Sequence, residues 1–209
     1  MTFTSLLVAN RGEIAIRVTR AAADLGIRTV AVYSDDDAES LHTRIADEAR
    51  RIEGRGAMAY LDVDAVIAAA QDAGCDAIHP GYGFLSEHAG FARRCAAAGI
   101  TFVGPNVEHL ELFGDKGRAR AAAAAADVPT LRGLDHAVSV EEARAFLESL
   151  GTGGAMMIKA VAGGGGRGTR SVTDPAELEA AYERCQSEAT ASFGNGDVYV
   201  EEFIPRARH

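Results

Sequence analysis

Short apolar runs alternate with longer amphipathic segments through the first half of the 209-residue chain. The apolar runs predict buried strands at residues 5–9, 29–33, 76–79 and 100–103. Between them, apolar residues recur every three or four positions, which predicts helices at residues 13–25, 62–73 and 86–98. Ser86 is expected to cap the last of these helices. Strands separated by helices of this length indicate βαβ units, so residues 1–113 should form a Rossmann-like domain with a parallel sheet.

The second half has a different pattern and predicts a smaller α+β unit. Residues 114–130 include a run of alanines at 121–126 and predict a helical linker that ends before Pro129. Ser139 and Glu142 form a capping box, which marks the start of a helix. The elements expected within residues 131–209 are helices at 139–150 and 174–189 and strands at 155–160, 169–172 and 197–202. The expected fold class is therefore α/β, with a small α+β unit after the parallel sheet.

Composition narrows the class of protein. Hydrophobic residues make up 47% of the chain and charged residues 24%, which supplies a core and is ordinary for a globular protein. The net charge of -9 argues against broad nucleic-acid binding, which needs a basic surface. Arg11 and Glu13 come too early for a signal peptide, and no apolar run approaches the roughly 20 residues of a membrane span. We expect a cytoplasmic protein that binds neither membranes nor nucleic acids and has free cysteine thiols.

A lysine followed by consecutive glycines is the strongest chemical signal. The glycines at 163–166 expose backbone N–H groups that could cradle phosphates, and Lys159 and Arg167 add two cations. The alternative is a flexible hairpin turn, which would lose much chain entropy on ordering. The spacing formally matches G-x-G-x-x-G, but the next helix starts only at residue 174, and the P-loop pattern is absent. A glycine loop between two strands matches the nucleotide lid of ATP-grasp enzymes better.

Polar residues after two predicted strands are weaker signals. The turn at residues 9–15 (ANRGEIA) lies at the carboxyl end of the first strand, where open α/β sheets bind ligands. Residues 79–87 follow another strand, and the glycines on either side of Tyr82 let the backbone approach a ligand. Each turn also has a plainer interpretation. The first could be a capped turn, and the second a tight turn with a packed tyrosine.

Other charged positions are less specific on their own. Lys116 opens the alanine-rich helix, where a cation opposes the helix dipole, so we expect its charge to serve another purpose. The last strand and the short linker after it could present Glu201 and the adjacent backbone to an adenine edge, although an edge strand with solvated carboxylates is the default interpretation. Asp35, Asp36 and Asp37 point in different directions as consecutive residues, so we expect them to face solvent rather than to bind a metal ion.

Taken together, the motifs carry a resemblance to a known family. The motifs VANRGEIAIR, AIHPGYGFLSE, FVGP, GDK, IKAVAGGGGRG and VEEFIPRARH occur in that order. With them the chain resembles the biotin carboxylase family throughout its length. The resemblance implies an ATP-grasp enzyme with a Rossmann-like N-terminal domain at 1–113, a helical linker at 114–130 and an incomplete ATP-grasp domain, its lid, at 131–209. One position departs from the pattern, because Thr169 stands where the family commonly has methionine.

The resemblance also implies roles for individual residues. Those that resemble the family's ATP contacts are Lys116, Lys159, Gly163, Gly164, Gly165, Gly166, Thr169, Glu201, Glu202, Phe203, Ile204 and His209. Tyr82 and Gly83 lie where the family approaches biotin, and Arg17 and Arg20 fall near its usual homodimer surface. The family's magnesium ligands, its bicarbonate-activating glutamate and its catalytic arginines come after residue 209. We therefore expect neither a catalytic residue nor a metal ligand within the chain.

The implied function is ATP- and bicarbonate-dependent carboxylation of biotin within an acetyl-, propionyl- or longer acyl-CoA carboxylase, and pyruvate and urea stay open as other acceptors. ATP would phosphorylate bicarbonate to carboxyphosphate, and its decarboxylation would supply carbon dioxide to the biotin ring nitrogen. The implied cofactors are ATP, Mg2+, biotin and bicarbonate, and the implied partners are a biotin carrier, a carboxyltransferase and a second copy of the chain. The 209 residues alone are expected to be inactive. Two alternatives stay open: a non-catalytic nucleotide- or partner-binding module, and another ATP-grasp carboxylate ligase.

Overall fold

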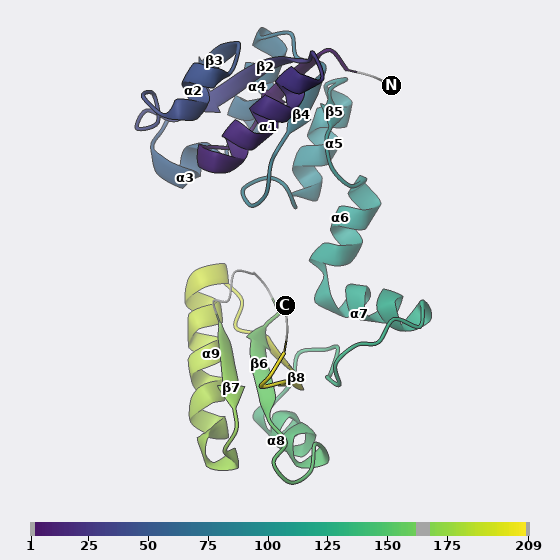
Figure 1. Cartoon of the computed structure of the whole chain (residues 1–209). Helices are drawn as coiled ribbons and strands as arrows, with labels where there is room; N and C mark the ends of the chain where they lie inside the picture. Colours follow the sequence, from purple (N-terminus) through teal and green to yellow (C-terminus); the bar gives the residue numbers. More distant parts are fainter. Residues whose placement is uncertain (1–2, 162–167, 208–209) are drawn as a thin grey trace. The chain divides into compact units, whose positions relative to one another are not determined.

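The structure, a computed structural model, describes residues 3–161 and 168–207. It consists of two compact units, Met1–Gly114 and Asp115–His209. Figure 1 shows a parallel sheet flanked by helices in the first unit and a small antiparallel sheet in the second, which confirms the predicted α/β class. Among the helices in the described ranges, none combines the length and the apolar character needed to cross a membrane.

The sheet of the first unit is parallel throughout the described strands, in the order β3-β2-β1-β4-β5. Its strands are β1 (Ser5–Val8), β2 (Arg28–Tyr33), β3 (Glu48–Arg51), β4 (Ala77–His79) and β5 (Thr101–Phe102). The predicted apolar runs account for every strand except β3, whose sequence EARR carries three charges. An edge strand needs no apolar run, because only one side of its backbone is paired and its side chains reach water.

Helices cover both faces of this sheet, and the side-chain alternation of the strands shows why. The helices are α1 (Gly12–Asp24), α2 (Leu41–Ile45), α3 (Gly56–Ala59), α4 (Val63–Asp72), α5 (Ala89–Ala97) and α6 (Val107–Gly114). Leu6 and Val8 of β1 pack in one cluster with apolar residues of α1. Leu7, between them, packs in the other cluster with α4 and α5. The packing on both faces therefore fixes the carboxyl ends of the neighbouring strands β1 and β4 side by side.

The predicted cap at Ser86 is wrong. Helix α5 begins at Ala89, and its N-cap is His88, whose side chain accepts a hydrogen bond from the Phe91 N–H. Ser86 is instead held in the preceding turn, where its N–H donates to the Gly83 carbonyl at 2.9 Å. The residues that the pattern assigned to the start of the helix belong to this preceding turn. The helix therefore starts three residues later than residue 86.

The second unit contains an antiparallel sheet in the order β7-β6-β8, and two of its helices pack on one face of it. Its elements are α7 (Lys116–Ala125), α8 (Val140–Ser149), β6 (Met156–Ala160), β7 (Thr169–Val172), the 3-10 turn Pro175–Glu177, α9 (Leu178–Phe193) and β8 (Val198–Glu202). The predicted capping box of Ser139 and Glu142 is confirmed. Helix α9 runs beyond the predicted end at residue 189, because the left-handed Gly194 terminates it.

The two faces of this small sheet differ in character. Met156 and Ile158 of β6 pack with Val200 of β8 against α8 and α9, and these residues form the core of the unit. The alternate positions point to the opposite face. They are Met157 and Lys159 on β6, Thr169 on β7, and Tyr199 and Glu201 on β8. The sequence-predicted ATP residues on the strands therefore share one face, except Glu202, which lies on the core side of β8.

Candidate functional site

An ion pair joins two of the predicted site residues across the small sheet. Lys159 on β6 and Glu201 on β8 lie diagonally in the register, and the lysine ammonium donates to the glutamate carboxylate. The pair is sheltered, because 30% of the lysine side chain and 13% of the glutamate side chain are exposed. The sheet therefore holds a cation at a fixed place on the face away from its helices.

Lys116 reaches the same place from a different element. Asp115 caps α7 by accepting a hydrogen bond from the Arg118 N–H, which sets Lys116 at the first helical position. The Lys116 ammonium donates to the carbonyls of Ala160 and Val161, at 3.4 and 3.2 Å, and lies 5.9 Å from the centre of the Tyr199 ring. The Lys116 charge thus lies at the sheet rather than along its own helix, which is consistent with the expectation that it serves another purpose.

The electrostatics of the cluster favour a ligand with negative charge. Burial lowers the pKa of Lys116, the positive charge of Lys159 lowers it further, and Glu201 partly offsets both. Burial, with the negative charge of Glu201, raises the pKa of Tyr199 to about 12, so its hydroxyl stays neutral. Two ammonium groups thus share one carboxylate, and an incoming anion would relieve their mutual repulsion.

Lysine usage across the chain strengthens this assignment. The sequence has 21 Lys and Arg residues in total, and Lys116 and Lys159 are its only lysines. Arginine serves every other cationic position, including exposed ones where either residue would do. A lysine differs from arginine as a compact point charge that approaches a phosphate oxygen without a planar fork. The two positions where the chain uses lysine are therefore the two that lie together on this face.

The remaining predicted ATP residues divide by position. Thr169 lies directly opposite Lys159 in the register. The ladder of backbone hydrogen bonds runs to Phe203, whose N–H donates to the Ala155 carbonyl, and among the described residues it does not continue to Ile204, which is 40% exposed. Gly163, Gly164, Gly165, Gly166 and His209 lie outside the described residues.

A second group of predicted residues meets at the ends of β1 and β4 in the first unit. Buried Asn10 donates from its amide nitrogen to the carbonyls of Pro80 and Tyr82, at 2.7 and 2.9 Å. The Tyr82 hydroxyl donates to the Glu13 carboxylate at 2.6 Å, and this bond raises the pKa of Tyr82. Tyr82 is 62% exposed and lines an open groove with Glu13, Gly83 and neighbouring residues. The motif at residues 9–15 thus acts as the support of the Tyr82 turn.

The expectation that all three consecutive aspartates face solvent is wrong for Asp37. Asp35 and Asp36 are exposed, but Asp37 is 5% exposed and accepts hydrogen bonds from Arg11 at 2.6 Å and from the Tyr60 hydroxyl at 2.8 Å. Burial acts to raise the pKa of Asp37, but the hydrogen bonds from Arg11, Tyr60 and Ser40 outweigh it and lower the pKa to about 2. Sequence reasoning missed this cluster because Tyr60 gives no local signal of its own.

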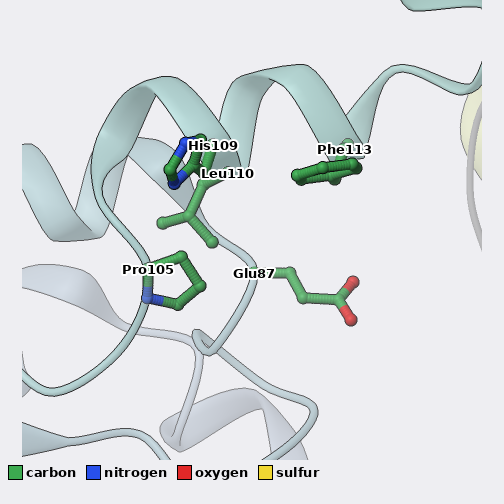
Figure 2. A pocket seen from close by; sticks show the side chains of 6 residues that line it. Glu87, Pro105, His109, Leu110 and Phe113 are labelled. Carbon is green, nitrogen blue, oxygen red and sulfur yellow. The ribbon is translucent and has the colours of Figure 1, made fainter. Parts of the chain in front are cut away.

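A further pocket in the first unit lies beside α6. Figure 2 shows Leu110 and the rings of His109 and Phe113 projecting from one helix toward Pro105 and Glu87. The lining is apolar apart from the Glu87 carboxylate and the His109 ring. None of the predicted site residues lines this pocket.

Neither metal-binding clusters nor disulfides occur within the described residues. No group of three His, Cys, Asp or Glu side chains there could hold a metal ion. Cys75, Cys95 and Cys185 are free and buried, and burial raises the pKa of both Cys95 and Cys185 to about 11. Such thiols are not poised to act as nucleophiles.

Two family models match the chain, one in each half. Residues 2–110 match the family of the biotin carboxylase N-terminal domain, and residues 115–209 match that of the carbamoyl-phosphate synthase L chain ATP-binding domain. The chain is 52% identical to a pyruvate carboxylase of Staphylococcus aureus over 98% of its own length and 18% of the relative's. It is 48% identical to a biotin carboxylase of Nostoc sp. over its whole length and 47% of the relative's.

Solved structures show the same similarity. A biotin carboxylase of Campylobacter jejuni in a β-γ-ATP complex superposes with a TM-score of 0.91 at 41% identity, over 97% of this chain and 46% of that one. The biotin carboxylase domain of Hydrogenobacter thermophilus 2-oxoglutarate carboxylase, with MgADP and bicarbonate, gives 0.90 at 44% identity, over 98% and 45%. The chain thus spans less than half the length of these relatives. Because the N-terminal domain family alone matches more than half of its residues, the chain belongs to the biotin carboxylase family.

Proposed function

We propose that the chain forms the front part of a biotin carboxylase, which uses ATP and bicarbonate to carboxylate biotin. The observation that carries the proposal is the meeting of Lys116, Lys159 and Glu201 on the face of the small sheet away from α8 and α9. This face offers concentrated positive charge in a sheltered place, which suits the phosphates of ATP.

In this proposal the two lysines act by position and charge. Lys159 and Lys116 contact phosphate oxygens of ATP, and the glycines Gly163, Gly164, Gly165 and Gly166 add backbone N–H groups. Such contacts stabilise the charge that moves between phosphate oxygens, without transferring a proton. Glu201 holds Lys159 in place before the nucleotide arrives. These roles need no catalytic acid or base within the chain.

The adenine would lie at the end of β8. Within residues 3–161 and 168–207 the backbone ladder runs no further than Phe203, so the Ile204 N–H is the next one that could bond to an adenine ring nitrogen. Thr169, opposite Lys159, would flank the nucleotide, and His209 would add a contact. Glu202 lies on the core side of the strand, so only its backbone is positioned for this role.

The biotin side would lie at the Tyr82 turn. Asn10 fixes the carbonyls on either side of Gly81, and Gly83 leaves the backbone open toward the groove. A ureido ring needs hydrogen-bonding groups and a flat apolar contact, and a backbone amide beside an exposed tyrosine ring supplies both.

The described residues do not form a binding site for Mg2+. The candidate ATP face carries two ammonium groups and one carboxylate, and the described residues hold no ligand cluster for a cation. Hard cations such as Mg2+ prefer several oxygen ligands. We therefore assign no Mg2+ ligand to the described residues.

The acceptor and the partners are further parts of the proposal. An acyl-CoA acceptor is supported by similarity to a long-chain acyl-CoA carboxylase, 47% identical with a TM-score of 0.68 over 81% of this chain. Pyruvate is the second candidate, favoured by the 52% identity to a pyruvate carboxylase. A biotin carrier, a carboxyltransferase and a homodimer through the exposed Arg17 and Arg20 of α1 complete the expected cytoplasmic assembly. Residues 1–113, 114–130 and 131–209 would be its first domain, linker and ATP-grasp lid.

A joined protein tests the proposal. In it, the chain is followed by the part of the Nostoc biotin carboxylase that the match leaves uncovered. We expect ATP cleavage that depends on both bicarbonate and free biotin, and Lys159→Met should lower kcat/KM for ATP by about 100-fold or more. Cleavage in the folded protein that ignores bicarbonate and biotin would indicate another ATP-grasp ligase. If the folded joined protein binds no nucleotide, a non-catalytic partner-binding module remains as the explanation.

A further inference from the structure

Phe84, next to the proposed biotin side, has an unusual backbone. Its φ is +42°, in the left-handed region that bulky residues rarely adopt. The other described non-glycine residue with positive φ is Asp127, a residue type that tolerates this conformation more readily. Left to itself, a phenylalanine prefers the right-handed or extended regions by roughly tenfold in population. Some tertiary contact must therefore hold it.

Phe84 stacks on the ring of a buried residue. The rings of Phe84 and Tyr60 lie 5.3 Å apart between centroids, with an angle of 22° between their planes. Tyr60 is 1% exposed and is itself fixed at its far end. Its hydroxyl donates to Asp37 at 2.8 Å and accepts from the Ser34 N–H at 3.3 Å.

The anchor beneath Tyr60 stays charged and ordered. Asp37 also accepts from Arg11 at 2.6 Å and from Ser40 at 3.1 Å, and its pKa of about 2 keeps it a carboxylate at neutral pH. The Arg11 guanidinium lies 5.9 Å from the centre of the Tyr60 ring. Arg11 directly follows Asn10, which holds the Pro80 and Tyr82 carbonyls. The short segment after β1 thus contacts the turn through Asn10 and the Tyr60–Asp37 pair through Arg11.

We propose that Tyr60 is a positioning residue for the biotin-side turn, because its ring holds Phe84 in the left-handed conformation and thereby places Tyr82 and Gly83 at the groove. Tyr60 acts through Phe84 and touches no substrate. The link to biotin rests on the proposed function, whereas the link between Tyr60 and the turn does not.

A rescue experiment separates this role from simple core packing. Tyr60→Leu removes the ring that Phe84 needs, whereas Tyr60→Phe keeps the ring and removes its hydrogen bonds to Asp37 and Ser34. Phe84→Gly removes the backbone strain, since glycine adopts positive φ freely. If Tyr60 serves the turn, Phe84→Gly rescues Tyr60→Leu. If Tyr60 only fills the core, the double variant has a larger void and is worse than either single variant.

The first readout uses the 209-residue chain and does not depend on biotin. In amide NMR spectra, Tyr60→Leu should shift or broaden the Gly83 and Ser86 signals, and the double variant should return the Ser86 signal, whose N–H bonds to Gly83, toward its original position. Tyr60→Phe should leave both signals nearly unchanged. Unchanged turn signals in a folded Tyr60→Leu chain, or no recovery in the double variant, would overturn the proposal.

The second readout uses the joined protein and compares the KM for biotin with the KM for ATP. Tyr60→Leu should raise KM for biotin by about tenfold and leave KM for ATP unchanged, and the double variant should recover most of that loss. Equal changes in both KM values would contradict a role at the turn. If the unsubstituted joined protein shows no biotin-dependent cleavage, the proposed function fails, while the NMR result still decides the role of Tyr60.

Discussion

Lys159 and Glu201 form an ion pair across β6 and β8, on the face of the small sheet opposite α8 and α9. The pair is diagonal, because Lys159 lies opposite Tyr199 and Glu201 lies opposite Met157. A partly buried lysine without a partner would lose hydration at a cost, and the carboxylate offsets that cost. The pairing therefore keeps a cation sheltered and oriented where we propose that phosphates bind.

Replacing Lys159 should weaken nucleotide binding. Lys159→Met keeps the length of the side chain and removes its charge, so the affinity of the 209-residue chain for ADP should fall by about tenfold or more, measured by isothermal titration calorimetry. Arg170→Met is the matched control, because Arg170 lies on the same sheet but pairs with Glu188 of α9. An equal loss of affinity in both variants would show that the effect is not local to this face.

The coupling between the two lysines can be measured directly. Reductive methylation with 13C-formaldehyde labels the lysines and the terminal amine, and the chain has only two lysines, so each signal can be followed through a pH titration. Lys159→Met should raise the pKa of Lys116, because it removes a nearby like charge, and Glu201→Gln should lower it. A Lys116 pKa that moves in neither variant would contradict the cluster.

The Tyr82 turn should tolerate a methyl group at one glycine and not at another. A Cβ at Gly81 would lie 2.6 Å from the Asn10 amide nitrogen, whereas a Cβ at Gly83 would meet nothing within 4 Å. Both residues have positive φ, so Gly83→Ala should cost about 1 kcal/mol of unfolding free energy and Gly81→Ala about 1–3 kcal/mol more. Urea denaturation measures both values. Equal costs would show that Asn10 does not pack closely on Gly81.

The buried carboxylate of Asp37 should give a distinct pH dependence. Its pKa of about 2 lies below the ordinary 3.8, so its contribution to stability is fully present above about pH 4 and is lost as the pH falls toward 2. Measured by urea denaturation, the stability gap between the unsubstituted chain and Asp37→Asn should shrink by about 2 kcal/mol across that range. Asp35→Asn, at an exposed ion pair with Arg51, should show a smaller change. A stability gap that stays constant with pH would contradict the hydrogen bonds assigned to the Asp37 carboxylate.

Sequence patterns predicted the elements whose own residues carry the signal. The apolar runs gave β1, β2, β4 and β5, and Ser139 with Glu142 gave the start of α8. Strand β3 was not predicted because an edge strand can be charged. The prediction at Ser86 was wrong because a local turn bond to Gly83 occupies its N–H before the helix begins.

The candidate site was predictable only in part. The two lysines stood out through their motifs, but their approach to each other and to Glu201 depends on the register of β6 with β8 and on the placement of α7. Asp37 and Tyr60 are separated by 23 residues and have no joint pattern, so their pairing follows only from the packed structure.

The most direct test of the central claim is transfer of labelled carbon to biotin. The joined protein, given ATP, magnesium, free biotin and 14C-bicarbonate, should form acid-labile 14C-carboxybiotin, and Lys159→Met should abolish it while Arg170→Met does not. The isolated 209-residue chain should form none. A folded joined protein that binds ATP yet yields no labelled biotin under these conditions would contradict the account.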